Sequence, residues 1–387
     1  MSEMVDTGNS FRIGVVAPGP RSESYAHALT QVDGAKIAAA MAGTRAAAEL
    51  QRLFPSIALQ RDIGSLTNRL DLQALLVVDP VSDLFGILRR ALLCNKHVLA
   101  SMVSPISSRQ LQELSFLARR RSRLLMFVEE RPFHPALVFL RWMLSGKSGL
   151  WHPHYLRGLF APGAGYGSGA SMAALVIEEL ALCARLLDAN PVSVSAVVCR
   201  APAEATPVAA FIHLSYPEGQ IVSLEISLVE AQEARQWALA TSSKTVFLDE
   251  CDTRSPLKII SSTSEPASHS LLSADPPVPL TDWPTESSVT PPFQSTDVRV
   301  EQLRYFVESA HKQDLKHSNA SFWAEVASTW EATQESINLS GVPVAVVEQS
   351  QSGKEQVGER PRLRLIHGKG MSNVGARKKP ALTVVSR

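Results

Sequence analysis

Short apolar runs alternate with helix-like segments along residues 11–125, and this alternation restricts the fold more than any other feature of the sequence. Strands joined by helices of this length need right-handed crossovers, which predict a doubly wound, parallel α/β sheet. The runs lack polar alternation, as expected for strands buried on both faces. We therefore predict a Rossmann-like domain over residues 11–128, with strands at 11–16, 36–41, 74–78, 97–100 and 124–128.

The pattern changes near residue 129, where longer segments begin to alternate apolar and polar residues. Alternation over successive strands indicates an antiparallel sheet with one covered face and one face in water. Residues 129–347 are thus predicted to form an α+β domain with an open, mainly antiparallel sheet. Its strands are expected at 154–160, 192–199, 208–216, 221–230, 238–240 and 245–249, and its helices at 135–145, 171–187, 297–310 and 321–336.

Three segments have the composition of disordered chain. They are residues 1–10, a Ser-, Thr- and Pro-rich excursion at 262–297 within the second domain, and a basic tail at 348–387. The tail suits a solvated segment, with docking to an acidic partner as the alternative. A chain of 387 residues also exceeds the size at which one core stops growing, about 250–300 residues, so two domains are expected.

The overall charge and composition exclude several classes of function. A net charge of +1 with 19% charged residues provides no basic face for nucleic acid. No apolar stretch is long and uncharged enough to cross a membrane, and the acidic N-terminus does not resemble a secretory signal. The four cysteines lack metal-binding or disulfide spacing, so we expect no metal site and reduced, buried thiols in a cytoplasmic protein.

The turn after the first predicted strand is where a Rossmann fold binds a dinucleotide pyrophosphate. Its sequence, A-P-G-P-R-S at 17–22, keeps only Gly19 of the G-x-G-x-x-G pattern, with Ala17 and Ser22 as small replacements at the outer positions. Pro20 also removes one N–H donor. Two interpretations stay open: an altered cofactor site formed by Ala17, Gly19 and Ser22, or a plain turn between a strand and a helix.

The second predicted strand ends without the acid that would hold the ribose 2′-hydroxyl of NAD. The sequence there is A-G-T-R at 42–45. Thr44 and Arg45 would instead suit the 2′-phosphate of NADP, so NADP is slightly favoured over NAD if a cofactor binds at all. Arg45 as an ordinary solvated residue in the first turn of a helix is an equal alternative.

Several stretches resemble, in the same order, the glucose-fructose oxidoreductase-type (Gfo/Idh/MocA) family. The most specific is ALLCNKHVLASMVSP at 91–105, which is similar to the family segment A-L-x-x-G-K-H-V-x-x-E-K-P. LDLQALLVVDP at 70–80 resembles the third strand and ends at Pro80, the position of a proline that faces the cofactor. The other matching stretches are FRIGVV…AHAL at 11–29, EERPFHPALVFLRWMLSGKSG at 129–149 and LLDANPVSVSA at 186–196.

The resemblance implies NAD(P)-dependent oxidation or reduction of a sugar or polyol by a two-domain protein. It also implies a homodimer or homotetramer formed through the C-terminal sheet. The sequence departs from the family at both positions of proton transfer. The E-K-P lysine aligns with Met102, or with Ser104 if the proline is aligned, and the D-x-x-x-H residues align with Ala174 and Glu178.

Four residues are candidates for a rebuilt substrate site. Glu178, unless it is simply a solvated helix carboxylate, or His134 would replace the missing acid–base groups, and Arg131 and Tyr166 would bind substrate. Arg131 and His134 follow the fifth strand at the carboxyl edge of the sheet, where open α/β folds place ligands. Tyr166 lies in a glycine-rich loop at 163–169. Two functions remain open: a divergent NAD(P)-dependent oxidoreductase, or a non-catalytic dinucleotide- or ligand-binding sensor or scaffold.

Overall fold

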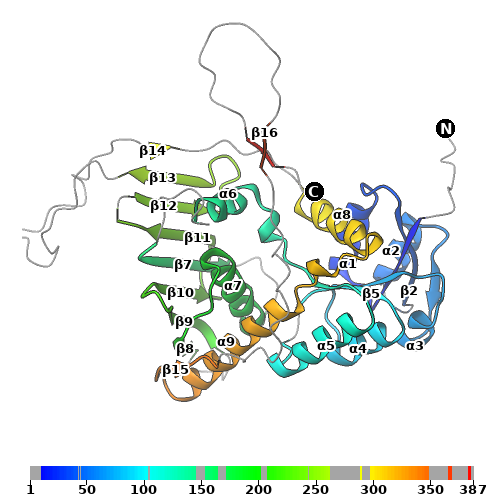
Figure 1. Cartoon of the computed structure of the whole chain (residues 1–387), viewed down its shortest axis with the longest axis horizontal. Coiled ribbons are helices and arrows are strands. Elements are labelled where there is room, and N and C mark those ends of the chain that lie inside the picture. Colours follow the sequence, from blue (N-terminus) through cyan, green and yellow to red (C-terminus); the bar gives the residue numbers. More distant parts are fainter. Residues whose placement is uncertain are drawn as a thin grey trace, which may run out of the picture.

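The computed structural model of the chain contains two large β-sheets with helices packed on them (Figure 1). It describes residues 10–41, 43, 45–102, 105–144, 153–163, 171–201, 207–242, 244–261, 288–289, 297–347, 365–367 and 382–384. The segments predicted to be disordered lie almost entirely outside these ranges. A parallel sheet followed by a mainly antiparallel one confirms the predicted α/β class.

The first sheet has six parallel strands in the order β3-β2-β1-β4-β5-β6. This order is the doubly wound arrangement of Rossmann folds. The sequence predicted every strand except β3, whose three residues form no apolar run. The strands are β1 (Phe11–Val15), β2 (Ala35–Met41), β3 (Ala58–Gln60), β4 (Ala74–Val77), β5 (His97–Ala100) and β6 (Leu125–Phe127).

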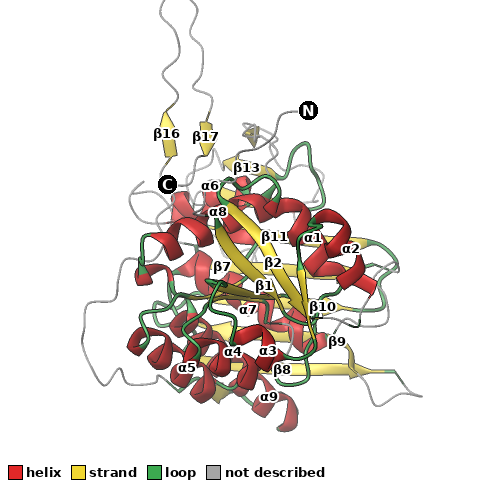
Figure 2. Ribbon diagram, turned by 90° about the vertical axis from the view of Figure 1, so that its right-hand side faces the viewer, coloured by secondary structure: helices red, strands yellow, loops and turns green. Residues whose placement is uncertain are grey.

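Helices cover both faces of this sheet (Figure 2). They are α1 (Pro20–Leu29), α2 (Arg45–Leu53), α3 (Ile63–Thr67), α4 (Leu84–Leu93), α5 (Ser108–Arg120) and, much later in the chain, α8 (Val298–His311). α8 packs against α1, and its Leu303 and Phe306 lie in one buried core with Val15 and Tyr25. The core of the opposite face, under α4 and α5, continues into the second sheet.

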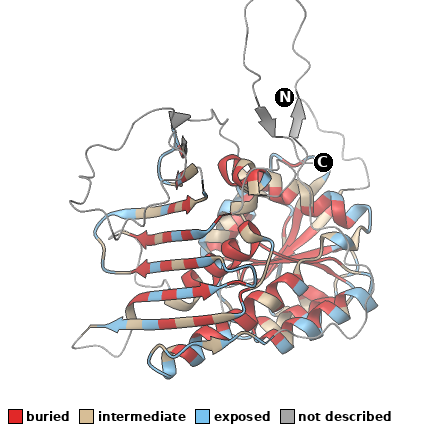
Figure 3. Cartoon of the chain, turned by 60° about the vertical axis from the view of Figure 1, so that its left-hand side comes forward, coloured by how far each residue is buried: buried red, intermediate tan, exposed pale blue. Residues whose placement is uncertain are grey.

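The second sheet has nine strands in the order β14-β13-β12-β11-β7-β10-β9-β8-β15. β7 and β10 run parallel, and the other neighbouring pairs are antiparallel. Burial alternates along the strands, so one face is covered and the other meets water (Figure 3). The strands are β7 (Tyr155–Pro162), β8 (Ser193–Arg200), β9 (Pro207–Ser215), β10 (Ile221–Ser227), β11 (Glu233–Ala240), β12 (Lys244–Asp249), β13 (Leu257–Ser261), β14 (Ser288–Val289) and β15 (Val344–Ala345).

Helix α9 (Ala320–Asn338) joins the two sheets. It packs against α5 of the first domain and against β8 and α7 (Met172–Leu187), and α6 (Pro135–Leu144) packs on α7. At the start of α9, the Asn319 amide donates to the carbonyl of Phe127 at 2.9 Å and accepts its N–H at 2.7 Å. Asn319 thereby satisfies backbone groups of β6, which would otherwise be a bare edge strand.

The remaining elements are short. They are the 3₁₀ turns η1 (Arg131–Phe133) and η3 (Leu315–His317) and the paired strands β16 (Leu365–His367) and β17 (Leu382–Val384). None of the described helices combines the length and the apolar character needed to cross a membrane. Across the described residues, no group of His, Cys, Asp and Glu side chains is arranged to hold a metal ion. The four cysteines are unpaired, but the expectation of buried thiols is confirmed only for Cys183. Cys94 is half-buried, and Cys199 and Cys251 are exposed.

His97, at the start of β5, makes the fold sensitive to acid. The residue is 5% exposed, and its Nδ1 accepts the backbone N–H of Leu124 at 3.0 Å. Burial, reinforced by Arg123 and His311, lowers the pKa of His97 from 6.5 to about 4. Because the folded pKa lies below the unfolded one, the stabilisation is complete above pH 6.5 and is lost as the pH falls toward 4, about 3 kcal/mol in all.

Urea unfolding between about pH 4 and pH 7 should show this loss in the wild type. The His97→Asn variant keeps an acceptor but does not titrate, so its free energy of unfolding should depend less steeply on pH. His134 and His317, whose pKa values are also lowered by burial, remain in both proteins and cancel in the comparison. Identical pH profiles for the two proteins would contradict this role of His97.

Candidate functional site

The carboxyl ends of β1 and β4 lie side by side where the first sheet reverses its winding. The chain leaves β1 for α1 and β2 on one side, and leaves β4 for α4 and β5 on the other. Open α/β sheets bind ligands in the crevice at such a switch point. Two segments meet there: the turn at 17–22 and Asp79, which follows β4.

The Asp79 carboxylate occupies the N-terminus of α1. Its Oδ2 accepts the backbone N–H groups of Gly19 and Ser22, each at 2.9 Å, together with the Ser22 hydroxyl, and its Oδ1 accepts the N–H of Arg21 at 3.0 Å. Pro20, between them, has no N–H. One carboxylate therefore uses the free donors of the first turn of α1, and Asp79 is only 3% exposed.

Two small residues allow this close approach. A Cβ atom on Gly19 would lie 2.6 Å from Oδ1 of Asp79, so a larger residue would push the carboxylate away. Ala17 takes the left-handed conformation with a φ of 44°, which glycine adopts freely and alanine adopts at a cost of about 1–2 kcal/mol. The backbone at Ala17 thus has a conformation that favours glycine, although of the three glycines of G-x-G-x-x-G the sequence keeps only Gly19.

The described residues of this turn do not fit a dinucleotide held in the usual way. A pyrophosphate at the N-terminus of α1 needs the same N–H groups that Asp79 already uses, and the buried carboxylate would repel it. Pro80, the next residue, is exposed. Thr44, another predicted cofactor contact, lies outside the described residues.

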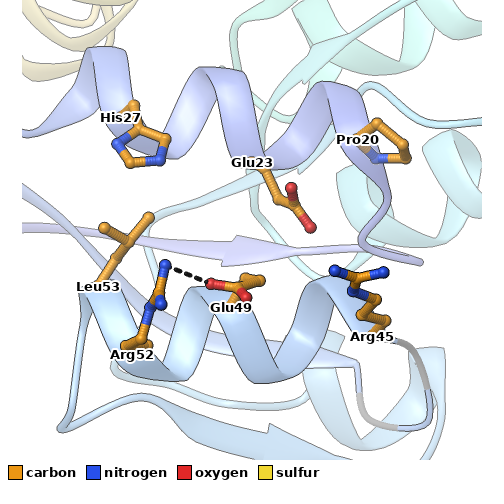
Figure 4. Close-up of a pocket in the computed structure, with 7 residues that line it drawn as sticks. All are labelled: Pro20, Glu23, His27, Arg45, Glu49, Arg52 and Leu53. Carbon is orange, nitrogen blue, oxygen red and sulfur yellow. Dashed lines mark ion pairs between the residues drawn. The ribbon is translucent and has the colours of Figure 1, made fainter.

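Arg45 borders a shallow groove between α1 and α2, at the end nearest Pro20 (Figure 4). Arg52, in the same groove, pairs with Glu49 at 2.8 Å. Because carboxylates and cations are mixed along the groove, it has no strong preference for a phosphate, and a contact of Arg45 with an NADP 2′-phosphate stays a prediction. The groove has a volume of about 360 Å³ and is lined by Pro20, Glu23, His27, Arg45, Glu49, Arg52 and Leu53.

Arg131, the first residue of η1, is held between two buried carboxylates. Its Nη1 donates to Glu179 of α7 at 2.6 Å, and its Nε and Nη2 donate to the two oxygens of Glu250, which follows β12. Burial disfavours the guanidinium charge, but Glu179 and Glu250 outweigh this effect and raise the pKa of Arg131. The group predicted to bind substrate is thus already engaged with protein carboxylates.

Glu129 forms a second buried ion pair near the same strand end. Both of its oxygens accept from Arg185 of α7, each at 2.8 Å, and Oε1 also accepts from the Asn319 amide at 2.7 Å. The Arg185 guanidinium lies over the Phe322 ring, 3.6 Å from its centre, which adds a cation–π contact with α9. Glu129 therefore links the end of β6 to both α7 and α9.

Glu130 makes a third link, to helices on the other face of the first sheet. It accepts from the Tyr25 hydroxyl of α1 at 3.1 Å and pairs with Arg299 of α8 at 3.4 Å. Burial and the Glu130 charge both raise the pKa of Tyr25, so the phenol stays protonated and can donate. Residues 129–131 thus connect α1, α7, α8, α9 and the second sheet through consecutive charged side chains.

Glu178 precedes Glu179 on α7, and its side chain reaches solvent although many protein atoms lie around it. Desolvation raises the pKa of Glu178, while the charges of Arg131, Arg21 and Arg235 act to lower it. Arg21 belongs to α1 and Arg235 to β11, so the charges that act on this carboxylate come from both domains. We refer to Glu178, Arg21 and Arg235 as the interdomain cluster.

The other predicted site residues are placed as follows. His134 follows η1, its Nδ1 is buried without a hydrogen-bond partner among the described residues, and burial lowers the pKa of its ring. Met102 is buried and Ala174 is half-buried. Tyr166 and Ser104 lie outside the described residues.

Asp79 was not among the site residues predicted from the sequence. It stands directly after an apolar run, in the stretch LDLQALLVVDP at 70–80. A doubly wound sheet has two halves, and here β4 begins the second half and lies next to β1, which begins the first. The end of β4 therefore lies beside the turn that follows β1, where such folds bind phosphate. An acid at that strand end was therefore a usable signal for a carboxylate at the turn.

Replacing Arg131 by Met should lower the free energy of unfolding by about 3–5 kcal/mol, because Glu179 and Glu250 would be buried without their cation. Urea unfolding measures this change. Arg89→Met is the matched control, since Arg89 and Glu113 are each about half exposed and their pair contributes at most about 1 kcal/mol. If both variants unfolded at the urea midpoint of the wild type, the Arg131 contacts would not hold the domains together.

The sequence matches no protein-family model, and no curated protein matches it. Solved structures do match over most of the chain. UDP-N-acetylglucosamine 3-dehydrogenase GnnA from Acidithiobacillus ferrooxidans has a TM-score of 0.70 at 17% identity, over 85% of this chain and 98% of that one. The 3-ketoreductase KijD10 from Actinomadura kijaniata, solved with TDP-benzene and NADP, has a TM-score of 0.69 at 18% identity, over 85% and 98% of the two chains.

A third similar structure is GenD2 from gentamicin A biosynthesis, solved with NAD. It has a TM-score of 0.69 at 16% identity, over 88% of this chain and 97% of that one. Likeness at such low identity establishes the architecture, because fold is retained long after site residues have changed. The chain therefore shares the fold of these three proteins.

Proposed function

We propose that this chain is a non-redox, ligand-binding protein, a sensor or scaffold, on the fold of NAD(P)-dependent sugar oxidoreductases. One observation carries the proposal: the Asp79 carboxylate uses the N–H groups of Gly19, Arg21 and Ser22, where a dinucleotide would place its pyrophosphate. A nicotinamide cofactor supplies the hydride chemistry in such enzymes. A chain that does not hold the cofactor keeps only the binding surface between its domains.

The residues at the positions of proton transfer support the same proposal. We propose that the chain belongs to the glucose-fructose oxidoreductase-type family, in which Met102, or Ser104 if the proline is aligned, takes the place of the lysine. Neither residue is a cation, and Met102 is described by the structure. Its thioether is buried and has no titratable proton, and Ala174, at the aspartate position, has no polar side-chain atom. A sugar dehydrogenase needs a group that accepts the hydroxyl proton as the hydride leaves.

A sugar or related polyol, bound at the interdomain cluster, is the proposed ligand. Glu178, Arg21 and Arg235 come from α7, α1 and β11, so a ligand there would contact both domains. Carboxylate and guanidinium groups form strong hydrogen bonds with hydroxyls. GnnA is a dehydrogenase of a nucleotide-linked sugar, UDP-N-acetylglucosamine, and KijD10 was solved with a nucleotide-linked compound, TDP-benzene; both favour ligands of the sugar class. Tyr166 stays a proposed further contact.

Titration with NADPH and NADH tests the proposal, because binding changes the fluorescence of reduced nicotinamide. We expect no saturable change for the wild type with cofactor up to about 1 mM. KijD10, solved with NADP, provides a control protein of the same fold. Saturable binding to the wild type in the micromolar range would overturn the non-redox proposal.

A redox enzyme with Glu178 as its base is the second candidate, and one observation favours it. Glu178 stands at the position of the family histidine, and desolvation raises the pKa of its carboxyl, which suits a group that accepts a proton. Arg45 and Thr44 would then make NADP the preferred cofactor, and His134 would be the alternative base.

Glu178→Gln distinguishes the two candidates. In a ligand-binding protein this change should weaken sugar binding about tenfold, because one charge-assisted hydrogen bond is lost, and no variant should turn over NADPH or NADP. In an enzyme it should abolish a turnover that the wild type shows. Binding is screened by thermal shift over a panel of sugars, with Glu335→Gln, at an exposed position of α9, as the control. Equal affinities in all three proteins would remove Glu178 from the ligand site.

We further propose that the chain forms a homodimer or homotetramer through the open face of the second sheet. Large apolar side chains are exposed there on neighbouring strands, and such a patch on a soluble protein marks an interaction surface. Light scattering of the purified protein measures its mass in solution. The exposed residues are Tyr155, Val197, Phe211, Ile221 and Phe247.

A further inference from the structure

The buried Asp79 carboxylate forms no ion pair with any described residue. Its charge is balanced by the N–H groups of Gly19, Arg21 and Ser22, the Ser22 hydroxyl, and the positive end of the α1 dipole. A buried carboxylate is costly unless such groups satisfy it. The first turn of α1 is therefore an anion-binding site that the chain fills with its own side chain.

A carboxylate and a phosphate make the same demands on such a turn. Both accept several N–H groups at once, and both are stabilised by a helix N-terminus. Both also need a residue without Cβ at the point of closest approach, and here a Cβ on Gly19 would lie 2.6 Å from an Asp79 oxygen. The single glycine of the pattern thus serves the internal carboxylate in the way it would serve a pyrophosphate.

Asp79 reaches the turn from the end of a neighbouring strand. β4 pairs with β1 along Ile13–Val15, so the carboxylate is delivered to the turn by the sheet itself. A group fixed in this way acts at an effective concentration of about millimolar or higher. A free diphosphate would have to displace the carboxylate and would meet its negative charge.

We propose that Asp79 is an internal plug in a preserved diphosphate-binding turn, and that replacing this one side chain opens the turn to pyrophosphate and to the diphosphate of a dinucleotide. The inference rests on the proposed function, since it takes the wild type not to bind a dinucleotide. It goes further in two respects. It attributes the exclusion of a dinucleotide to Asp79 alone, and it names diphosphates as the ligands that the turn at 17–22 accepts once this carboxylate is removed.

Calorimetric titration with inorganic pyrophosphate and with NADPH tests the plug in the wild type, Asp79→Ala and Asp79→Asn. We expect no heat of binding for the wild type at about 1 mM ligand and at least about tenfold tighter binding for Asp79→Ala. Asp79→Asn should lie between them, because the amide removes the charge but still fills the turn. Ser22→Ala added to Asp79→Ala should weaken the gained binding, since it removes the hydroxyl donor.

Asp83→Ala is the matched control. It removes a carboxylate from the same loop, but Asp83 caps α4 through the N–H of Gly86 and makes none of the bonds to the turn at 17–22. It should bind pyrophosphate no better than the wild type. Equal gains in Asp83→Ala and Asp79→Ala would show a general charge effect and would overturn the plug.

The outcomes separate the plug from the proposed function. Folded Asp79→Ala and Asp79→Asn proteins that bind no better than the wild type would overturn the plug and leave the proposed function standing. A wild type that binds NADPH as tightly as Asp79→Ala would overturn both. A wild type that binds NADPH, with Asp79→Ala about tenfold tighter, would overturn the proposed function and support the plug.

A measurement on the wild type covers the case in which the variants fail to fold. The amide protons of Gly19, Arg21 and Ser22 should exchange slowly with solvent in the ligand-free protein, because Asp79 already accepts them. Adding pyrophosphate should leave these rates unchanged. Rapid exchange that slows when pyrophosphate is added would overturn the plug.

Discussion

The arrangement of the two domains depends on one constraint: the charged side chains buried at the carboxyl edge of the first sheet each need an oppositely charged partner. Arg131 finds its counterparts in Glu179 and Glu250, and Glu129 finds Arg185. A buried pair contributes little net stability, but separating its partners is costly because each charge is left without water or a counterion. These contacts therefore act mainly by penalising any other placement of α7 and the second sheet relative to β6.

The sequence predicts the fold well because the relevant signals are local. Apolar runs mark the buried strands of the first sheet, and alternation marks the half-exposed strands of the second. β3 was not predicted because Ala58–Gln60 is short and not fully buried. The packing of α8 against α1 also has no local signal, since nothing in Val298–His311 indicates which surface its apolar residues will cover.

The candidate site could be predicted only in part, because its character depends on pairs that lie far apart in the sequence. Arg131 and His134 were expected at the strand end, and they lie there. The partner Glu250, however, is 119 residues away from Arg131, and no spacing rule connects them. The sequence shows a charged residue at a strand end, but it does not show whether that charge is free for a ligand or is already paired within the protein, as it is for Arg131.

The same ambiguity applies to the phosphate turn, and Asp79 resolves it. Counting glycines suggests a degraded cofactor site, but the N–H groups of Gly19 and Ser22 hold an anion, the carboxylate of Asp79. A cofactor that binds only the folded protein stabilises it in proportion to the logarithm of its concentration. A carboxylate carried by the chain satisfies the first turn of α1 at every cofactor concentration. Gly19 and Ser22 therefore have a structural role in holding the Asp79 carboxylate, whether or not a dinucleotide binds.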